Sequence, residues 1–250
     1  MKNSHLICGA LLMFATPALS AGFINMMWND CPLAPGVVNV NNACTSNNGS
    51  YTLITSFGPP ADMPQFMGCA GVIDLQTNVA VLSQWWHMET GGCRDGKMTW
   101  DANFSLGPYF CIDFWQNLAS GGIEYAVPSP GLGGTNTARI RTLQTVATPG
   151  PITVLDANLD QNEYYAFKIK ILKALSTGTG ACAGCLDKAC LVFNSLSLSQ
   201  PALTPDVEIT CGPQIVVTYN NGTGVLNCLW HCQTVPTHKN TWGSIKAIYR

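Results

Sequence analysis

The side chains best suited to acid–base chemistry gather in one stretch of the chain. His87 and Glu89 stand two residues apart, and Asp95 and Asp101 follow. The His-x-Glu spacing is one half of a zinc-deaminase signature, but the other half requires Pro before a Cys-x2-Cys pair, where this sequence has Ala181. The sequence has no Gly-x-Ser-x-Gly elbow and no His-Glu-x-x-His motif. A hydrolase is therefore the alternative hypothesis, and it requires that some pair of these four side chains lines one cleft.

A cysteine-rich segment, C-A-G-C-L-D-K-A-C, allows two interpretations. Its Cys-x2-Cys pair has the spacing of zinc and thioredoxin-like redox sites. However, no second Cys-x2-Cys or His-x-His pair follows it, no βαβ pattern surrounds it, and Leu186 stands where haem attachment requires His. In an exported chain, structural disulfides are the favoured role for Cys182, Cys185 and Cys190.

Oxygen-bearing side chains recur at every second position through Asp156, Asn158 and Asp160. Such ligands can wrap a hard cation, so calcium is the one cofactor that the sequence suggests. An EF-hand loop would need Gly at its sixth position and Glu at its twelfth, where this chain has Gln161 and Phe167. An ordinary polar turn before a strand is the simpler alternative.

Tryptophans supply the candidate ligand-binding residues. Aromatic rings exposed on β-proteins can stack on sugar rings, although large aromatics are mostly buried. We expect Trp100 and Trp115 to lie in the core. Trp85 and Trp86 are adjacent, and two neighbours in an extended segment cannot both face inward. They are therefore the predicted binding residues, with carbohydrate or a cell-surface component as the partner.

The sequence predicts strands as the elements that position these residues. From Tyr165 to Ile171 large apolar side chains stand at every second position, the returning run that starts at Leu191 is rich in β-formers, and Pro201 ends that run. We expect these runs to form a central hairpin with the cysteines at its tip. Many other short strands with turn signals, and no long segment of period 3.6, predict an all-β fold: an antiparallel, jelly-roll-like β-sandwich stapled by disulfides.

The two ends of the chain carry different signals. Residues 1–21 have the apolar stretch and small-residue cleavage site of a signal peptide. We assign residues 22–204 to the sandwich, 205–232 to a cysteine-containing hairpin appendage and 233–250 to a tail with a short amphipathic helix. In that helix Thr241 is the expected N-cap, and Trp242, Ile245 and Tyr249 share one face, which either packs on the domain or docks the chain to a partner.

The cysteine count and the net charge limit which partners and bonds the protein can have. After removal of the signal peptide, an odd number of cysteines remains, so at least one is free, liganded or bridged to another chain. Only 10% of residues are charged and the formal net charge is −2, which argues against nucleic acid as a partner. No later segment has the ~20 apolar residues of a membrane span. Local pairing predicts the disulfides Cys31–Cys44 and Cys93–Cys111, a bridge from Cys211 to Cys228 or Cys232, and one bridge within 182–190.

The chain resembles an uncharacterised family of secreted bacterial β-rich proteins. The likeness covers most of the mature chain, and its most specific parts are the CAGC cysteine knob and the closing T-W-G-x-I-K-x-x-Y-R motif. The resemblance implies export and a compact β-rich domain, and it supplies no activity or catalytic residue. The matching segments are Trp28 with Asp30 and Cys31, Val72 to Leu75, Trp85 and Trp86, Gly92 to Arg94, Cys111 to Asp113, Glu163 to Lys168, Cys182 to Cys185, and Thr241 to Arg250.

These observations predict a secreted, extracellular or cell-surface protein that is not an enzyme. It would act as a binding or structural β-sandwich, and the sequence leaves its oligomeric state and its ligand open.

Overall fold

A computed structural model describes most of the chain between the predicted signal peptide and the C-terminal tail. Asn158, Asp160 and the predicted C-terminal helix lie outside the described residues. The described ranges are 22–31, 36–102, 111–146, 153–156, 163–201 and 204–222.

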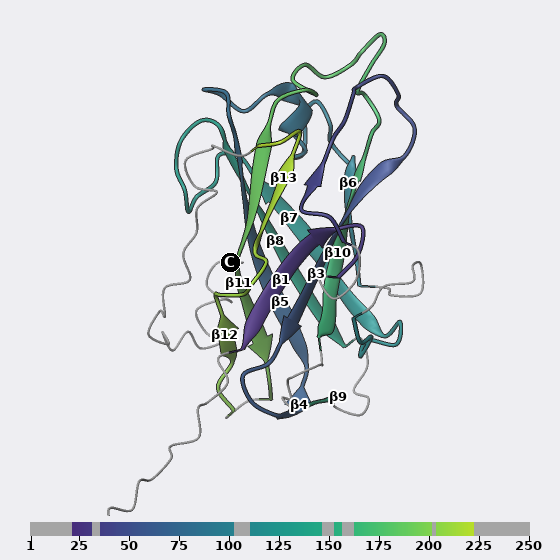
Figure 1. Ribbon diagram of the computed structural model, residues 1–250. Coiled ribbons are helices and arrows are strands. Elements are labelled where there is room, and N and C mark those ends of the chain that lie inside the picture. The colour runs from purple at the N-terminus through teal and green to yellow at the C-terminus, as the bar shows by residue number, and fades with distance from the viewer. Residues whose placement is uncertain are drawn as a thin grey trace, which may run out of the picture.

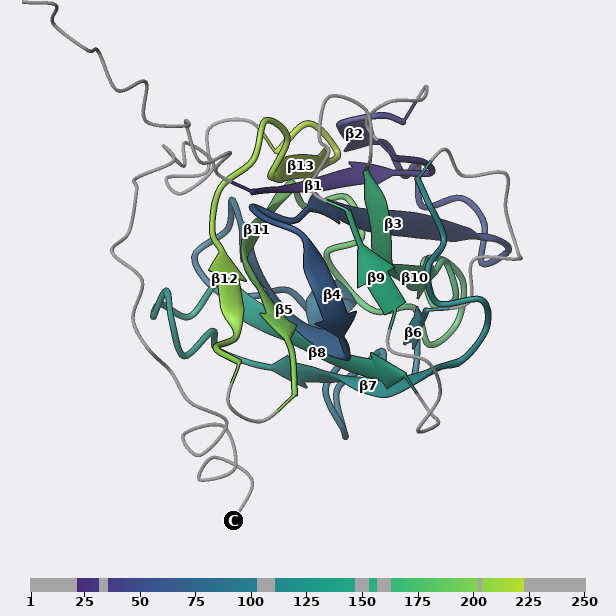
Figure 2. The same cartoon turned by 90° about the horizontal axis from the view of Figure 1, so that it is seen from below.

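The regular secondary structure of the described chain is almost entirely β, and its strands form two facing sheets (Figures 1 and 2). The smaller sheet has the order β1 (Phe23–Trp28), β3 (Ser50–Gly58), β10 (Tyr164–Leu172) and β6 (Met98–Asp101), and every pairing in it is antiparallel. This confirms the predicted all-β class. Within the described ranges, no helix has the length and hydropathy needed to cross a bilayer.

The larger sheet has seven strands. Its order is β2 (Asn39–Val40), β13 (Val216–Tyr219), β11 (Ala189–Ser199), β5 (Gly68–Thr77), β8 (Thr137–Val146) and β7 (Ala119–Ala126), and β12 (Val207–Ile209) pairs with β11. Only the β2–β13 pairing is parallel. A two-stranded sheet of β4 (Met63–Phe66) and β9 (Thr153–Leu155) lies at the end of the molecule that faces the viewer in Figure 2.

The predicted central hairpin is wrong in its pairing. β10 pairs with β3 and β6, whereas β11 pairs with β5, β12 and β13, so the two strands belong to opposite sheets. The connection 173–188 therefore crosses from one layer to the other. Each strand buries its apolar face in the shared core, where Phe167 of β10 meets Phe193 of β11 edge to face at 6.1 Å between ring centroids.

The predicted boundary at residue 205 does not coincide with a break in the structure. β12 and β13 complete the larger sheet through their pairing with β11. Asn25 of β1 also bridges to Gln214, which brings the two sheets together along this side. The described part of the predicted appendage is thus integral to the sandwich.

A buried carboxylate holds the loop between β7 and β8 against the outer face of the larger sheet. Asp74 of β5 accepts hydrogen bonds from Ser129 Oγ at 2.6 Å, from Arg139 Nε at 2.8 Å and Nη2 at 2.6 Å, and from Asn194 Nδ2. Arg139 stands directly across from Asp74 in the register, and the hydrogen bond to this carboxylate raises the pKa of its guanidinium. One side chain thereby links strands β5, β8 and β11 to the loop.

Candidate functional site

Two disulfides join three loops at one end of the sandwich, and we call these loops, 41–49, 78–97 and 173–188, the cap. Cys44–Cys185 connects the first loop to the third across 141 residues, and Cys93–Cys182 connects the second to the third across 89 residues. The third loop is the connection between β10 and β11 (Figure 1). The two cysteines of the Cys-x2-Cys pair thus bind different loops.

The observed disulfides correct the local pairing scheme. The third described bridge, Cys31–Cys111, spans 80 residues. The predicted pairs Cys31–Cys44 and Cys93–Cys111, and a bridge within 182–190, are therefore wrong. The reason is topological: the 173–188 connection crosses between sheets and meets loops that are distant in sequence.

Two further cysteines of the described chain take part in disulfides. Cys190 and Cys211 are also disulfide-bonded. The predicted partners of Cys211 lie beyond Gly222, outside the described residues.

Close packing inside the cap depends on one glycine. Gly184, between the two bridged cysteines, has φ of +91°, a conformation that L side chains rarely adopt. A Cβ atom there would also collide with Ser83. The second and third loops therefore run side by side, joined by hydrogen bonds from Ser83 Oγ to Gly184 O at 3.5 Å and from Trp85 N to Ala183 O at 2.8 Å.

The two tryptophans predicted to bind carbohydrate lie inside the cap. Trp85 and Trp86 belong to a 3₁₀ turn, η1 (Gln84–Trp86), and both are fully buried. The tighter turn rotates successive side chains by less than the half-turn of a strand, so both can point inward. Both rings contact Tyr219: Trp85 stacks at 6.4 Å and Trp86 meets it edge to face at 5.1 Å. The expectation that they are exposed is wrong, and in this conformation neither ring is accessible to a sugar.

A buried cation, Arg94, lies inside the cap. The Arg94 guanidinium sits 3.2 Å from the ring centroid of Trp85, and it donates to Trp85 O at 3.0 Å and to Leu172 O. Burial lowers the pKa of Arg94 to about 10, so the group stays protonated at neutral pH. No carboxylate of the described chain forms an ion pair with it. Cation–π contact and carbonyl dipoles thus stabilise the charge.

We expect Arg94→Met to destabilise the protein by about 2–3 kcal/mol, because the substitution leaves the carbonyl groups of Trp85 and Leu172, the first of them buried, without their charged donor. Urea unfolding measures the loss, and near-UV circular dichroism should show a changed environment of Trp85. Lys97→Met, in the same loop but half-buried, is the control and should change stability by less than about 0.5 kcal/mol. Equal effects of the two substitutions would contradict this role for Arg94.

The structure brings together two of the four candidate hydrolase residues. His87 Nδ1 lies 2.6 Å from Glu89 Oε1, and His87 Nε2 lies 3.1 Å from Leu82 O. A carbonyl oxygen only accepts, so Nε2 must carry a proton and cannot serve as a base while this bond persists. Asp95 Oδ2 accepts from Gly91 N in the loop, and Asp101 forms an ion pair with Lys168 on β6 and β10.

Amide side chains gather where the first loop of the cap meets the ends of β2 and β13. Asn41 Oδ1 accepts from Asn39 Nδ2 and from Asn221 Nδ2, both at 3.2 Å. Asn221 N donates to Asn39 Oδ1 at 2.9 Å. Asn41 and Asn221 are exposed, and each amide offers both donors and an acceptor. Sequence reasoning missed this amide cluster, because Asn39 and Asn41 lie 182 and 180 residues from Asn221 and only the parallel β2–β13 pairing brings them together.

Of the predicted calcium ligands, the structure describes only Asp156. Its backbone N and O both lie within hydrogen-bonding distance of Tyr164 Oη, at 2.9 and 3.2 Å. Over the ranges described, no three or more His, Cys, Asp or Glu side chains gather as a metal site would require. The calcium site stays a prediction.

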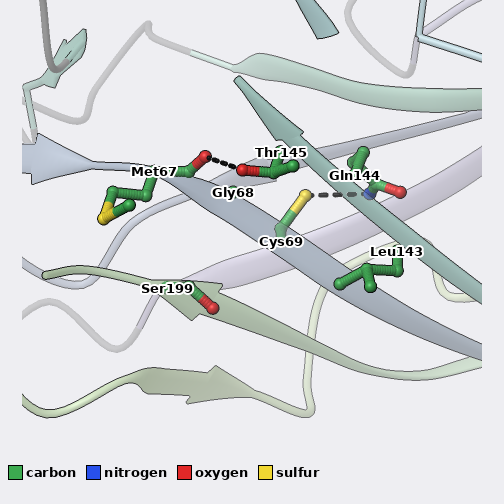
Figure 3. Close-up of a pocket in the computed structure, with 7 residues that line it drawn as sticks. All are labelled: Met67, Gly68, Cys69, Leu143, Gln144, Thr145 and Ser199. Atoms are coloured by element: carbon green, nitrogen blue, oxygen red, sulfur yellow. Dashed lines mark hydrogen bonds between the residues drawn. The ribbon is translucent and has the colours of Figure 1, made fainter. Parts of the chain in front are cut away.

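One cysteine in the described chain is free. Cys69, on β5, is buried, and its sulfur accepts a hydrogen bond from Gln144 Nε2 at 2.9 Å (Figure 3). This agrees with the odd cysteine count. Burial raises the pKa of the Cys69 thiol to about 12. The thiolate, which is the reactive form, is therefore almost absent at pH 8.

We expect the folded protein to react with a thiol reagent such as dithionitrobenzoate far more slowly than the denatured, unreduced protein does. Denaturation should release one thiol per mature chain, and peptide mapping should place it at residue 69. A free cysteine mapped to residues 182–190 would contradict the disulfide assignment.

Comparison of the chain with protein-family models, with curated proteins and with solved structures found no match.

Proposed function

We propose that the protein is a non-enzymatic module of binding or structural type that works outside the cytoplasm, with the cap and the adjoining ends of β2 and β13 as its contact surface. Disulfides of this number persist in oxidising compartments, and the chain begins with a signal-peptide pattern. Together these features support a secreted or cell-surface protein.

The observation that carries the proposal is the covalent linkage of the cap. Three loops from distant parts of the chain are held in one arrangement by Cys44–Cys185 and Cys93–Cys182. A preorganised surface loses little conformational entropy when it binds a partner. Loops at one end of a β-sandwich are a common place for such contacts.

Polar, uncharged groups are the ligand chemistry that the amide cluster fits best. Asn39, Asn41 and Asn221 offer amide donors and acceptors from a rigid sheet edge, and sugar hydroxyl groups need both. A carbohydrate or glycosylated cell-surface component is therefore the partner we propose, recognised through amides instead of through Trp85 and Trp86.

A glycan array with the oxidised protein tests this version. We expect binding that falls at least about tenfold in the Asn41→Ala, Asn221→Ala double variant, because each lost amide removes hydrogen bonds of about 0.5–1.5 kcal/mol. Asn48→Ala is the matched control, since Asn48 is also exposed in the cap but lies outside the amide cluster. Absence of binding on the array would refute the carbohydrate version, and equal losses in all variants would refute the role of the cluster.

The His87–Glu89 contact favours a second candidate, a secreted hydrolase. That function requires Nε2 to leave Leu82 O and face a substrate. A panel of ester, glycoside and peptide substrates separates the candidates. Turnover of one substrate by the wild type, lost in both His87→Ala and His87→Gln, would establish the hydrolase and end our proposal.

A further inference from the structure

Two cysteines of the larger sheet have disulfide partners beyond the described residues. Cys190 and Cys211 are both disulfide-bonded, yet the three bridges between described cysteines include neither of them. After Gly222 the sequence holds two more cysteines, Cys228 and Cys232, and the one other cysteine left lies in the predicted signal peptide. Within one mature chain, the two bridges therefore join Cys190 and Cys211 to Cys228 and Cys232.

Cys190 belongs to a small apolar patch on the outer face of the larger sheet. Val192 is on the same face, because it stands across from Asp74 of β5 and across from Val216 of β13. Side chains on an outer face are ordinarily exposed, but Cys190 and Val192 keep only 2% and 4% of their surface accessible. Among the described apolar side chains, Val216 alone packs against this pair, and three small side chains cannot enclose one another. Another segment therefore covers the patch.

The two points of attachment follow one strand of the sheet. A Cβ atom on Gly222 would collide with Ala189 O, so the chain leaves β13 right beside Cys190. Cys211 comes two residues after the end of β12, which pairs antiparallel with the second half of β11. This places Cys211 about four residues beyond Cys190 along β11, or roughly 13 Å.

The sequence L-N-C-L-W-H-C, residues 226–232, matches this spacing. In an extended chain every second side chain shares one face, and here that face carries Leu226, Cys228, Trp230 and Cys232. Four residues separate the two cysteines, and an extended chain covers roughly 13 Å in that length. One strand can thus reach both points of attachment while it turns two large apolar side chains toward the patch.

We propose that residues 223–232 lie extended across the outer face of the larger sheet, fixed by the bridges Cys190–Cys228 and Cys211–Cys232. The chain leaves β13 beside Cys190, so in this order it meets the nearer point first and runs on without reversing. The crossed order would require it to pass Cys190, reach Cys211 and then turn back within four residues.

An unsatisfied amide indicates where the indole of Trp230 lies. Asn194 Nδ2 donates to Asp74, whereas Asn194 Oδ1 is buried and has no hydrogen-bond partner in the part of the chain that the structure describes. A buried tryptophan usually finds an acceptor for its Nε1 hydrogen. Trp230 is midway between the two bridges, so its ring covers Val192 and its N–H donates to Asn194 Oδ1.

The proposed path also directs the rest of the tail. From the second bridge, residues 233–250 continue toward the end of the sandwich opposite the cap, which stays uncovered. A tail that docks the chain to a partner would thus hold the cap away from that partner. The path of residues 223–232 goes beyond the proposed function and does not depend on it.

Peptide mapping of the oxidised, unreduced mature protein tests the two bridges. Trypsin, glutamyl endopeptidase and chymotrypsin separate the four cysteines by cleavage after Lys188, Glu208, Tyr219 and Trp230. We expect one linked pair that contains Cys190 and Cys228 and another that contains Cys211 and Cys232. The crossed pairing, a bridge between Cys190 and Cys211, or bridges between two chains would each overturn the proposal.

Two leucines on opposite faces of the proposed strand test whether it covers the patch. Leu226→Asp places a charge against apolar side chains and should lower the midpoint of thermal unfolding by at least about 4 °C. Leu229→Asp is the matched control, because its side chain points to solvent, and it should lower the midpoint by less than about 2 °C. Mapping of both variants checks that their bridges still form. Equal shifts, or a larger shift for Leu229→Asp, would overturn the placement.

Discussion

Replacing Asp74 with Ala should cost about 3–5 kcal/mol of unfolding free energy, the largest effect of any single substitution considered. Its carboxylate accepts four hydrogen bonds, two of them from Arg139. Removing one partner of a buried ion pair leaves the other charge uncompensated, and that penalty dominates the cost. Urea unfolding monitored by tryptophan fluorescence measures it, with the slope m as a check that the transition stays two-state.

Glu124→Ala provides the matched control for Asp74. Glu124 pairs with Arg141 at 3.4 Å between β7 and β8, on the same sheet but with half of its side chain exposed. An exposed pair contributes about 0–1 kcal/mol. If the two substitutions cost the same, the buried network does not stabilise the sheet as described.

Removal of the Cys44–Cys185 bridge, by Ser at both positions, should cost about 2–5 kcal/mol. The bridge closes a loop of 141 residues, and chain-entropy reasoning gives about 5 kcal/mol for a loop of that length. The remaining bridges already restrict the unfolded chain, so the measured value should fall below that limit. Thermal unfolding measures the change, and hydrogen exchange should show faster opening of loop 41–49.

Cys69→Ala is the natural comparison, since it removes a cysteine without breaking a bridge. We expect a loss of about 1 kcal/mol, from a smaller buried side chain and the lost contact with Gln144. A larger loss for Cys69→Ala than for the bridge would mean that the cap does not depend on its covalent linkage.

Strand positions could be predicted from the sequence because they depend on local periodicity. The strands expected from Tyr165 to Ile171 and from Leu191 to Pro201 correspond to β10 (Tyr164–Leu172) and β11 (Ala189–Ser199), with ends that differ by one or two residues. Their partners could not be predicted, because an alternating strand buries one face equally well in a hairpin or in two facing sheets. The connection of sixteen residues between them is also long for a hairpin.

The site was less predictable than the fold. Trp85 and Trp86 were expected on the surface because side chains alternate between the two faces of an extended chain. They lie instead in a 3₁₀ turn, in which both side chains point inward. The predicted disulfide pairs were wrong for a related reason: pairing cysteines by their proximity in sequence ignores which loops the sheets bring together. Asp74 within the apolar run V-I-D-L, and Arg94 beside Cys93 in a chain with few charges, were the signals available for the buried polar groups.

The connectivity of the cap has a consequence for biosynthesis. A chain that enters an oxidising compartment N-terminus first exposes Cys44, Cys69, Cys93 and Cys111 long before Cys185 arrives. At about 5–20 residues per second, Cys44 waits roughly 7–28 seconds for its partner, which is long enough for oxidation to join neighbours in the order of their arrival. We therefore expect maturation to depend on a disulfide isomerase that exchanges those early bridges.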